Sequence, residues 1–302
     1  MNKEAMQQQI LEALTRKLTD GFHISVRKVL KTNVKLDGLT ITKDGENIAP
    51  TIYMEPFYEA LENGTSLDDV INSILQIYSE SAVPSAYYDL TSIHDFNNVK
   101  DRLYVELINR HSNKELLQDV PHDLFLDDFA VTVRYLVNAS ADEKSSFLVH
   151  SSHLNMWHID QKTLLSIALE NTRKLLGLDL RNMKDFIQEL LPDTVPLMDN
   201  SPHAPMWVMT NKYKLSGAAT ALFDDILKDF AEIHGSFYVI FSSVHEILLL
   251  LTPDNSDIDA ITKINQEINA ESVNPNEVLG TKAYYYCKSR GFILQDGKQY
   301  MN

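Results

Sequence analysis

The sequence predicts an α/β protein of the α+β type, with mixed, mainly antiparallel sheets that are covered by amphipathic helices and form two lobes. Two observations lead to this class. Phe237–Pro253 contains a dense aromatic and β-branched run, a short polar break and then the longest aliphatic run of the chain, Ile247–Leu251. This pattern predicts two buried strands or a hairpin. Stretches with apolar residues at helical spacing lie on either side of it in sequence and can cover both of its faces.

The first third of the chain predicts helices around a hairpin. Ala5–Leu18 is an amphipathic opening helix, whereas His23–Leu30 fits either a strand or a helix. The segments Leu36–Thr42 and Asn47–Met54 alternate or carry β-formers, and the Asp-Gly turn between them predicts that they pair. Two further helices are expected at Glu55–Glu62 and after the capping residue Ser66.

The middle third predicts strands followed by helices. Phe96–Ile108 fits a lead-in followed by a strand or helix, and a short helix is expected at Asn113–Gln118. Phe129–Asn138 is rich in Val, Thr and Tyr and should pair with Ser146–His150 as an antiparallel strand. Asp160 caps a strong helix that ends at Gly177, and a shorter helix covers Met183–Leu191.

A Pro-rich connection separates the two predicted lobes. The composition changes at 192–205, which contains four prolines, and a stiff segment without helix is expected there. The sequence therefore predicts an N-terminal lobe at 1–191 and a C-terminal lobe at 206–302. In the second lobe we expect these elements in order: a strand at Met206–Asn211, a helix from Ser216 or Gly217 to Ile233, the central pair, a helix capped by residues 254–257, a strand at Ala283–Cys287 and an optional edge strand after Gly291.

Charge and cysteine content narrow the class of protein. The chain has 302 residues, 27 Lys plus Arg, 42 Asp plus Glu and a formal net charge of -15. A field of this sign repels phosphate backbones and anionic lipids, so we expect neither a nucleic-acid partner nor a membrane partner. The single cysteine, Cys287, cannot form an intrachain disulfide, and no apolar run reaches the roughly 20 residues of a membrane helix. These features predict a cytoplasmic protein.

The sharpest chemical hypothesis concerns three histidines. His150, His153 and His158 fall within nine residues, and three imidazoles with an open fourth position are typical of a hydrolytic zinc-type site. His203, Asp127 or Asp128 would complete it. The spacing matches no strong metal motif, and the alternative is that these residues end a strand, occupy a solvated loop and frame the next helix. We therefore expect no cofactor, with a zinc-type metal as the alternative.

A second set of polar residues lies in the break of the central stretch. Ser242, Ser243, His245 and Glu246 contain the residue types of a nucleophile, a base and an orienting acid. In an extended strand, however, Ser243 and His245 would lie about 6 to 7 Å apart, and Glu246 would point to the other face. We interpret the four residues as a structural corner of the scaffold.

Three further motifs have simple packing explanations. Small residues at Ser216–Ala219 suit either an anion at a helix start or close helix–sheet packing. Tyr284–Tyr286 and Tyr87–Tyr88 resemble a stacking platform for bases, but no interleaved basic residues accompany them. Cys287 follows aromatic residues and is interpreted as a small buried hydrophobe.

Several segments together resemble a known family. They are Asn47–Glu55 before a Tyr-rich helix, Val120–His122, Asp127–Val131, Trp157 before Leu164 and Asn171, and Gly217–Ala219 with Ser242–Leu248. The set is similar to an uncharacterised bacterial family, a domain of unknown function frequent in gut Clostridia and their mobile elements. The resemblance covers nearly the whole chain and implies a bacterial cytoplasmic protein. It supplies no catalytic residues.

These observations favour a non-catalytic binding or regulatory protein that acts through contact with another protein. One alternative is a metal-assisted hydrolase that uses His150, His153 and His158. Another is an acidic mimic of nucleic acid, which requires carboxylates crowded on one face.

Overall fold

The protein is an α+β protein that forms two compact units, residues 1–91 and 92–302. The computed structural model describes residues 2–45, 49–81, 93–139, 144–190, 205–252, 258–293 and 299–300. The division thus falls after residue 91, and not at the Pro-rich connection 192–205 expected from composition. Strand β8 (Asp179–Asn182) precedes that connection and strand β9 (Met206–Thr210) follows it, yet the two pair in one sheet. Most of 192–205, like Tyr87 and Tyr88, lies outside the described residues.

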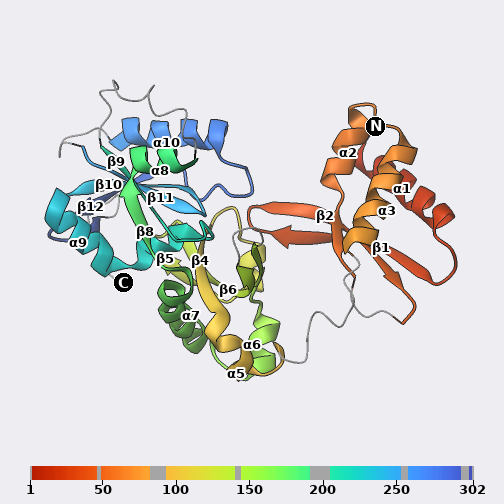
Figure 1. Ribbon diagram of the computed structural model, residues 1–302, viewed down its shortest axis with the longest axis horizontal. Helices are drawn as coiled ribbons and strands as arrows, with labels where there is room; N and C mark the ends of the chain where they lie inside the picture. Colours follow the sequence, from red (N-terminus) through yellow and green to blue (C-terminus); the bar gives the residue numbers. More distant parts are fainter. Residues whose placement is uncertain are drawn as a thin grey trace. The chain divides into compact units, whose positions relative to one another are not determined.

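The first unit packs three helices against one face of a three-stranded antiparallel sheet (Figure 1). Its strands, in the order β1-β2-β3, are β1 (Phe22–Lys31), β2 (Val34–Lys43) and β3 (Thr51–Tyr53). The helices are α1 (Lys3–Lys17), α2 (Glu55–Glu62) and α3 (Leu67–Ser81). The ambiguous segment His23–Leu30 is therefore a strand, and β2 pairs with β3 as the Asp-Gly turn predicts.

An inward carboxylate joins the sheet of this unit to its helices. The Asp37 side chain is 3% exposed and lies 2.5 Å from Lys28 Nζ and 3.3 Å from Lys3 Nζ. Burial alone would raise the pKa of Asp37, but these two ammonium groups hold it below its usual value.

The second unit contains two antiparallel sheets. In the smaller one, β6 (Phe129–Ala139) pairs with β4 (Leu103–Asn109) on one edge and with β5 (Asp123–Phe125) and β7 (Lys144–Leu148) on the other. The larger sheet has six strands in the order β13-β12-β10-β11-β9-β8. Its remaining strands are β10 (Phe237–Ser243), β11 (Glu246–Leu250), β12 (Ala283–Cys287) and β13 (Gly291–Ile293).

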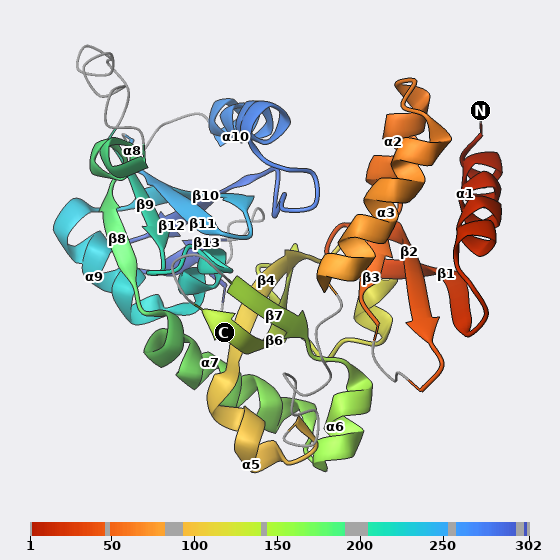
Figure 2. The same cartoon turned by 45° about the vertical axis from the view of Figure 1, so that its right-hand side comes forward.

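The main core lies between these sheets. The predicted central stretch forms β10 and β11, which pair antiparallel, and every residue of β10 is buried. Phe237, Val239 and Phe241 face the smaller sheet together with α7 (Gln161–Leu176) and α9 (Asp224–His234). The opposite face is covered by α8 (Met183–Leu190) and α10 (Ile258–Ser272), as Figure 2 shows.

Local expectations were wrong at a few places. The predicted helix from Ser216 to Ile233 is broken into a 3-10 helix, η5 (Gly217–Leu222), and α9, because Phe223 has a ψ of 72°. The remaining short helices of the described residues are α5 (Phe96–Val99), η2 (Lys100–Arg102), η3 (Leu116–Gln118) and α6 (Ser151–Trp157). Within the described ranges, no helix is long and apolar enough to cross a membrane.

Candidate functional site

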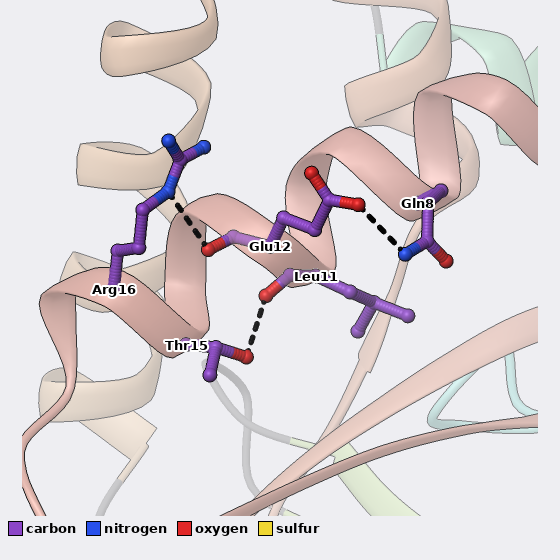
Figure 3. A pocket seen from close by; sticks show the side chains of 5 residues that line it. All are labelled: Gln8, Leu11, Glu12, Thr15 and Arg16. Carbon is purple, nitrogen blue, oxygen red and sulfur yellow. Dashed lines mark hydrogen bonds between the residues drawn. The ribbon is translucent and has the colours of Figure 1, made fainter.

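A hollow on α1 is a poor candidate for a site (Figure 3). The described residues that line it all belong to this one helix; they are Gln8, Leu11, Glu12, Thr15 and Arg16. Gln8 donates to Glu12 at 2.9 Å, and Thr15 and Arg16 donate to helix carbonyls. Because the polar groups already bond within the helix, this surface holds no convergent set of groups for a ligand.

A better candidate is a pocket in the second unit, because several separate elements converge there. It has a volume of about 370 Å³, near the lower end of the roughly 300–1,000 Å³ of ligand pockets. Its walls come from β5, from η5 and the first turns of α9, from the turn after β12, from β13 and from the C-terminal residues. The described lining residues are Phe125, Ala221, Asp224, Lys228, Lys288, Ser289, Arg290, Gly291, Phe292, Gln299 and Tyr300.

Aromatic side chains form the apolar wall of the pocket. Phe125 meets Phe292 edge to face at 5.7 Å between ring centroids, and it meets Tyr300 in the same way at 5.5 Å. The Tyr300 backbone N–H donates to the Phe292 carbonyl and its hydroxyl donates to the Leu124 carbonyl. Edge-to-face contacts of this kind are favourable, and they hold together three of the rings that line the pocket.

Three cationic side chains, those of Lys228, Lys288 and Arg290, also line the pocket, and the two lysines form ion pairs with carboxylates. Lys228 Nζ lies 2.5 Å from Asp224, and Lys288 Nζ lies 2.9 Å from Glu232. Asp224 also accepts from the Tyr286 hydroxyl at 2.9 Å. Burial and this carboxylate raise the pKa of Tyr286. Among the described residues, Arg290 has no carboxylate within ion-pair distance.

The turn that carries Arg290 also holds the single cysteine. The Arg290 N–H donates to the Cys287 carbonyl at 3.1 Å, and Gly291 at φ 71° leads into β13. A hydrogen bond with the Ser289 hydroxyl, aided by backbone N–H groups and the Arg290 side chain, lowers the pKa of the Cys287 thiol to about 7. Cys287 is thus a half-buried group with thiolate character, and not the inert core residue that its neighbours indicated.

The structure brings together two of the three histidines proposed as metal ligands. His150 and His153 lie at opposite ends of the first turn of α6, and the His150 N–H donates to His153 Nδ1 at 2.8 Å. His150 Nδ1 lies 2.8 Å from Asp119, whereas His158 ends α6 in a left-handed conformation with φ 55°. His153 stacks on Trp157, and burial lowers its pKa. The described residues hold no group of three His, Cys, Asp or Glu side chains placed to bind a metal ion.

The residues proposed to complete that site lie elsewhere. Asp128 bonds to His111 at 3.0 Å, to Lys282 at 2.9 Å and to the Tyr284 hydroxyl. Burial opposes its ionisation, but these three donors keep the pKa of Asp128 below its usual value. Asp127 has φ 60° in the turn between β5 and β6, and His203 lies outside the described residues. Asp128 therefore links β6 to β12.

The Ser242–Glu246 segment makes a tight corner between β10 and β11. Ser243 Oγ accepts from the His245 N–H at 2.9 Å, so this hydroxyl bonds to backbone and not to the imidazole. The Thr210 hydroxyl donates to the His245 carbonyl at 2.6 Å, and the Ala218 N–H donates to the Val244 carbonyl. Ser242 and Ser243 are both buried.

The close approach of η5 to the β10–β11 corner explains why the residue after Ser216 is a glycine. A Cβ at this position would lie 2.1 Å from the His245 carbonyl oxygen and 2.2 Å from Thr210 Oγ1. Ser216 itself has φ 49°, and its hydroxyl donates to the buried Glu106 at 2.8 Å. Close packing of η5 against the corner therefore requires glycine here.

The corner also places two ionisable side chains in unusual surroundings. Burial raises the pKa of Glu246, although His245 and the Ser243 hydroxyl favour the charged form. His245 Nε2 lies 3.6 Å from Glu277, and His245 Nδ1 is buried without a partner in the described part of the chain. Ser243, His245 and Glu246 therefore do not form the hydrogen-bonded arrangement of a catalytic triad.

Sequence reasoning missed the pocket, although one signal was present. The Tyr284–Tyr286 run is flanked by Lys282, Lys288 and Arg290. These cations lie outside the run, so they do not count as basic residues interleaved with the tyrosines. Phe125, Asp224 and Tyr300 reach the pocket from distant segments, which no local pattern indicates.

The fold and site together define an α+β protein with a small aromatic pocket and a cationic rim. The chain belongs to a family of unknown function (DUF5688), whose family model matches residues 3–288. No curated protein matches the chain. No solved structure matches it either.

Proposed function

We propose that this protein is a non-catalytic binding protein that acts through contact with another protein, and that the pocket of the second unit is its recognition site. The observation that carries the proposal is the pairing of a rigid aromatic wall with a cationic rim. Aromatic and arginine side chains are the groups that dominate the energy of protein interfaces.

The charge distribution supports an anionic partner. The chain carries a formal net charge of -15, yet the described lining of the pocket holds Lys228, Lys288 and Arg290 against the single acid Asp224. A local positive site in a negative surface attracts an anionic group while the surrounding field repels other polyanions. This arrangement favours selective recognition.

Affinity purification from the native host tests the proposal. The wild-type chain, Arg290→Glu and the control Lys162→Glu serve as baits, since Lys162 is an exposed cation of α7 in the same unit. We expect Arg290→Glu to lose a protein that the wild type and the control both retain. Equal recovery of every bound protein by all three baits would contradict the proposed recognition site.

A metal-assisted hydrolase remains the second candidate. The observation that favours it is the contact between His150 and His153, whose ring centroids lie 6.1 Å apart. Elemental analysis of the purified chain separates the two proposals. Stoichiometric zinc that is lost in His153→Ala would support the hydrolase and contradict the non-catalytic proposal.

The proposed setting is a bacterial cytoplasm, with a mobile element as the genetic carrier. It is supported by the family resemblance in Asn47–Glu55 and Ser242–Leu248 and by the single cysteine. Acidic mimicry of nucleic acid is less favoured, because several carboxylates are paired with cations, among them Asp37, Asp179, Glu189 and Asp225.

A further inference from the structure

We infer that the pocket takes a carboxylate of an acidic peptide segment, with a neighbouring aromatic or aliphatic side chain against the Phe125, Phe292 and Tyr300 wall. This inference rests on the proposed function and names the chemistry that the recognition site selects. It follows from the charge balance, the donor geometry and the size of the pocket.

Among the described lining residues, one of the three cations has no carboxylate partner. Asp224 neutralises Lys228, and Glu232 neutralises Lys288, at 2.5 and 2.9 Å respectively. Lys288 Nζ also donates to the Glu232 carbonyl at 3.2 Å. Arg290 lacks such a carboxylate in the described part of the chain, and its side chain is exposed at the pocket. Its side chain also bonds to the Cys287 thiol, which is only partly ionised at neutral pH and does not fully compensate the guanidinium. Arg290 is therefore the described lining cation best placed to pair with one negative charge on a ligand.

A single charge favours a carboxylate over a phosphate monoester. A phosphate group carries about -1.5 to -2 charge at neutral pH, and the described lining offers only one cation that is not already paired with a carboxylate. The planar guanidinium of Arg290 presents two parallel N–H donors that fit a carboxylate in bidentate fashion. The neutralised lysines can add hydrogen bonds without adding net charge.

The apolar wall determines what must accompany the carboxylate. Phe125 and Phe292 line the pocket but are only 2% and 6% exposed, so a ligand can reach only a small part of either ring. A volume of about 370 Å³ lies near the lower end of the range of ligand pockets, about 300–1,000 Å³. It suits a short motif in which an acidic residue is flanked by an apolar one.

Fluorescence anisotropy tests this inference on the full chain. The probe is a fluorescein-labelled peptide, Gly-Ser-Glu-Phe-Asp-Phe-Ser-Gly, and its matched control has Gln and Asn in place of Glu and Asp. We expect the acidic probe to bind at least about tenfold more tightly than the amide control, because a charge-assisted bond is lost. Raised salt should weaken the acidic probe selectively.

Two variants assign the interaction to Arg290. Arg290→Gln should reduce the affinity for the acidic probe by about tenfold, whereas Lys162→Gln should leave it unchanged. Arg290→Lys keeps the charge and loses the planar fork, so a reduced affinity there supports bidentate binding. Far-UV circular dichroism and the tryptophan emission of each variant establish that it is folded.

The outcomes separate the inference from the proposed function. Failure of the acidic probe to bind better than its amide control, or stronger competition by phenyl phosphate than by phenylacetate, would overturn the assignment of an acidic peptide. The proposed function would survive either result if Arg290→Glu still lost its native partner. Equal capture of that partner by Arg290→Glu would overturn the proposed function itself.

Discussion

Replacing Gly217 by alanine tests how tightly η5 is packed against the β10–β11 corner. The new Cβ would lie 2.1 Å from the His245 carbonyl oxygen and 2.2 Å from Thr210 Oγ1, whereas real contacts of a Cβ essentially never fall below 3.0 Å. The first obstacle is backbone, which cannot rotate away. Either η5 or the corner must therefore move.

The expected cost follows from the contacts that such a movement breaks. Overpacking of a dense interior costs about 1–3 kcal/mol. The Thr210–His245 bond of 2.6 Å and the Ala218–Val244 bond of 3.2 Å cross the same contact, and losing one buried hydrogen bond costs about 1 kcal/mol. We expect Gly217→Ala to lower the free energy of unfolding by about 3 kcal/mol.

Urea denaturation followed by tryptophan emission measures this loss. Trp157 and Trp207 are the two tryptophans of the chain, and both belong to the second unit, so their signal reports that unit alone. With a urea slope of about 1–3 kcal/mol per M, the midpoint should fall by about 1 M or more.

Gly280→Ala is the matched control in the same unit. A Cβ there would meet the Phe129 ring at 3.1 Å and the Phe241 carbonyl at 3.3 Å, so small adjustments suffice and we expect a loss of about 1 kcal/mol. An unchanged midpoint for Gly217→Ala, or a smaller shift than for Gly280→Ala, would refute the packing argument.

Further predictions concern the ionisable groups of the second unit. Because burial raises the pKa of Glu246, the folded state holds the Glu246 proton better than the unfolded state does, and the free energy of unfolding falls as the pH rises above the usual value of 4.5. Glu246→Gln should therefore raise the urea midpoint at neutral pH and flatten this decline. A lower midpoint for the variant would contradict the raised pKa of Glu246. Iodoacetamide should label Cys287 with a pH midpoint of about 7, and Ser289→Ala should move it toward the ordinary value of about 8.5; a midpoint near 8.5 in the wild type would be inconsistent with the thiolate. Asp128→Asn weakens the bonds to Lys282 and His111 and should cost about 2 kcal/mol by urea denaturation, whereas a loss within about 0.5 kcal/mol would show that the link is dispensable.

The regular elements could be predicted where local pattern and packing agree. The runs Phe237–Phe241 and Ile247–Leu250 are each continuous in apolar residues because β10 and β11 are covered on both faces. The helix α7 begins after Asp160 and ends before Gly177, as capping predicts. In both cases the residues that determine the element lie within it or next to it in sequence.

Other elements depend on contacts that are distant in sequence. The short, polar strand β8 exists because it pairs with β9 at the edge of the large sheet. The helix α6 has little apolar periodicity, and its first turn depends on the bond between His150 and His153. The break before α9 falls at Phe223, whose ψ of 72° is not helical, and no local sequence pattern indicates it. The pocket combines Phe125, Arg290 and Tyr300, and only the folded chain brings these residues together.

Chemical-shift mapping tests the central claim most directly. Amide spectra of the isotope-labelled full chain are recorded during titration with the unlabelled acidic peptide. We predict that the saturable shifts concentrate at Arg290, Phe292 and Tyr300, and that the amide-substituted peptide does not reproduce them. Saturable shifts confined to residues outside the described pocket lining, or equal shifts with both peptides, would contradict recognition of an acidic partner at this site.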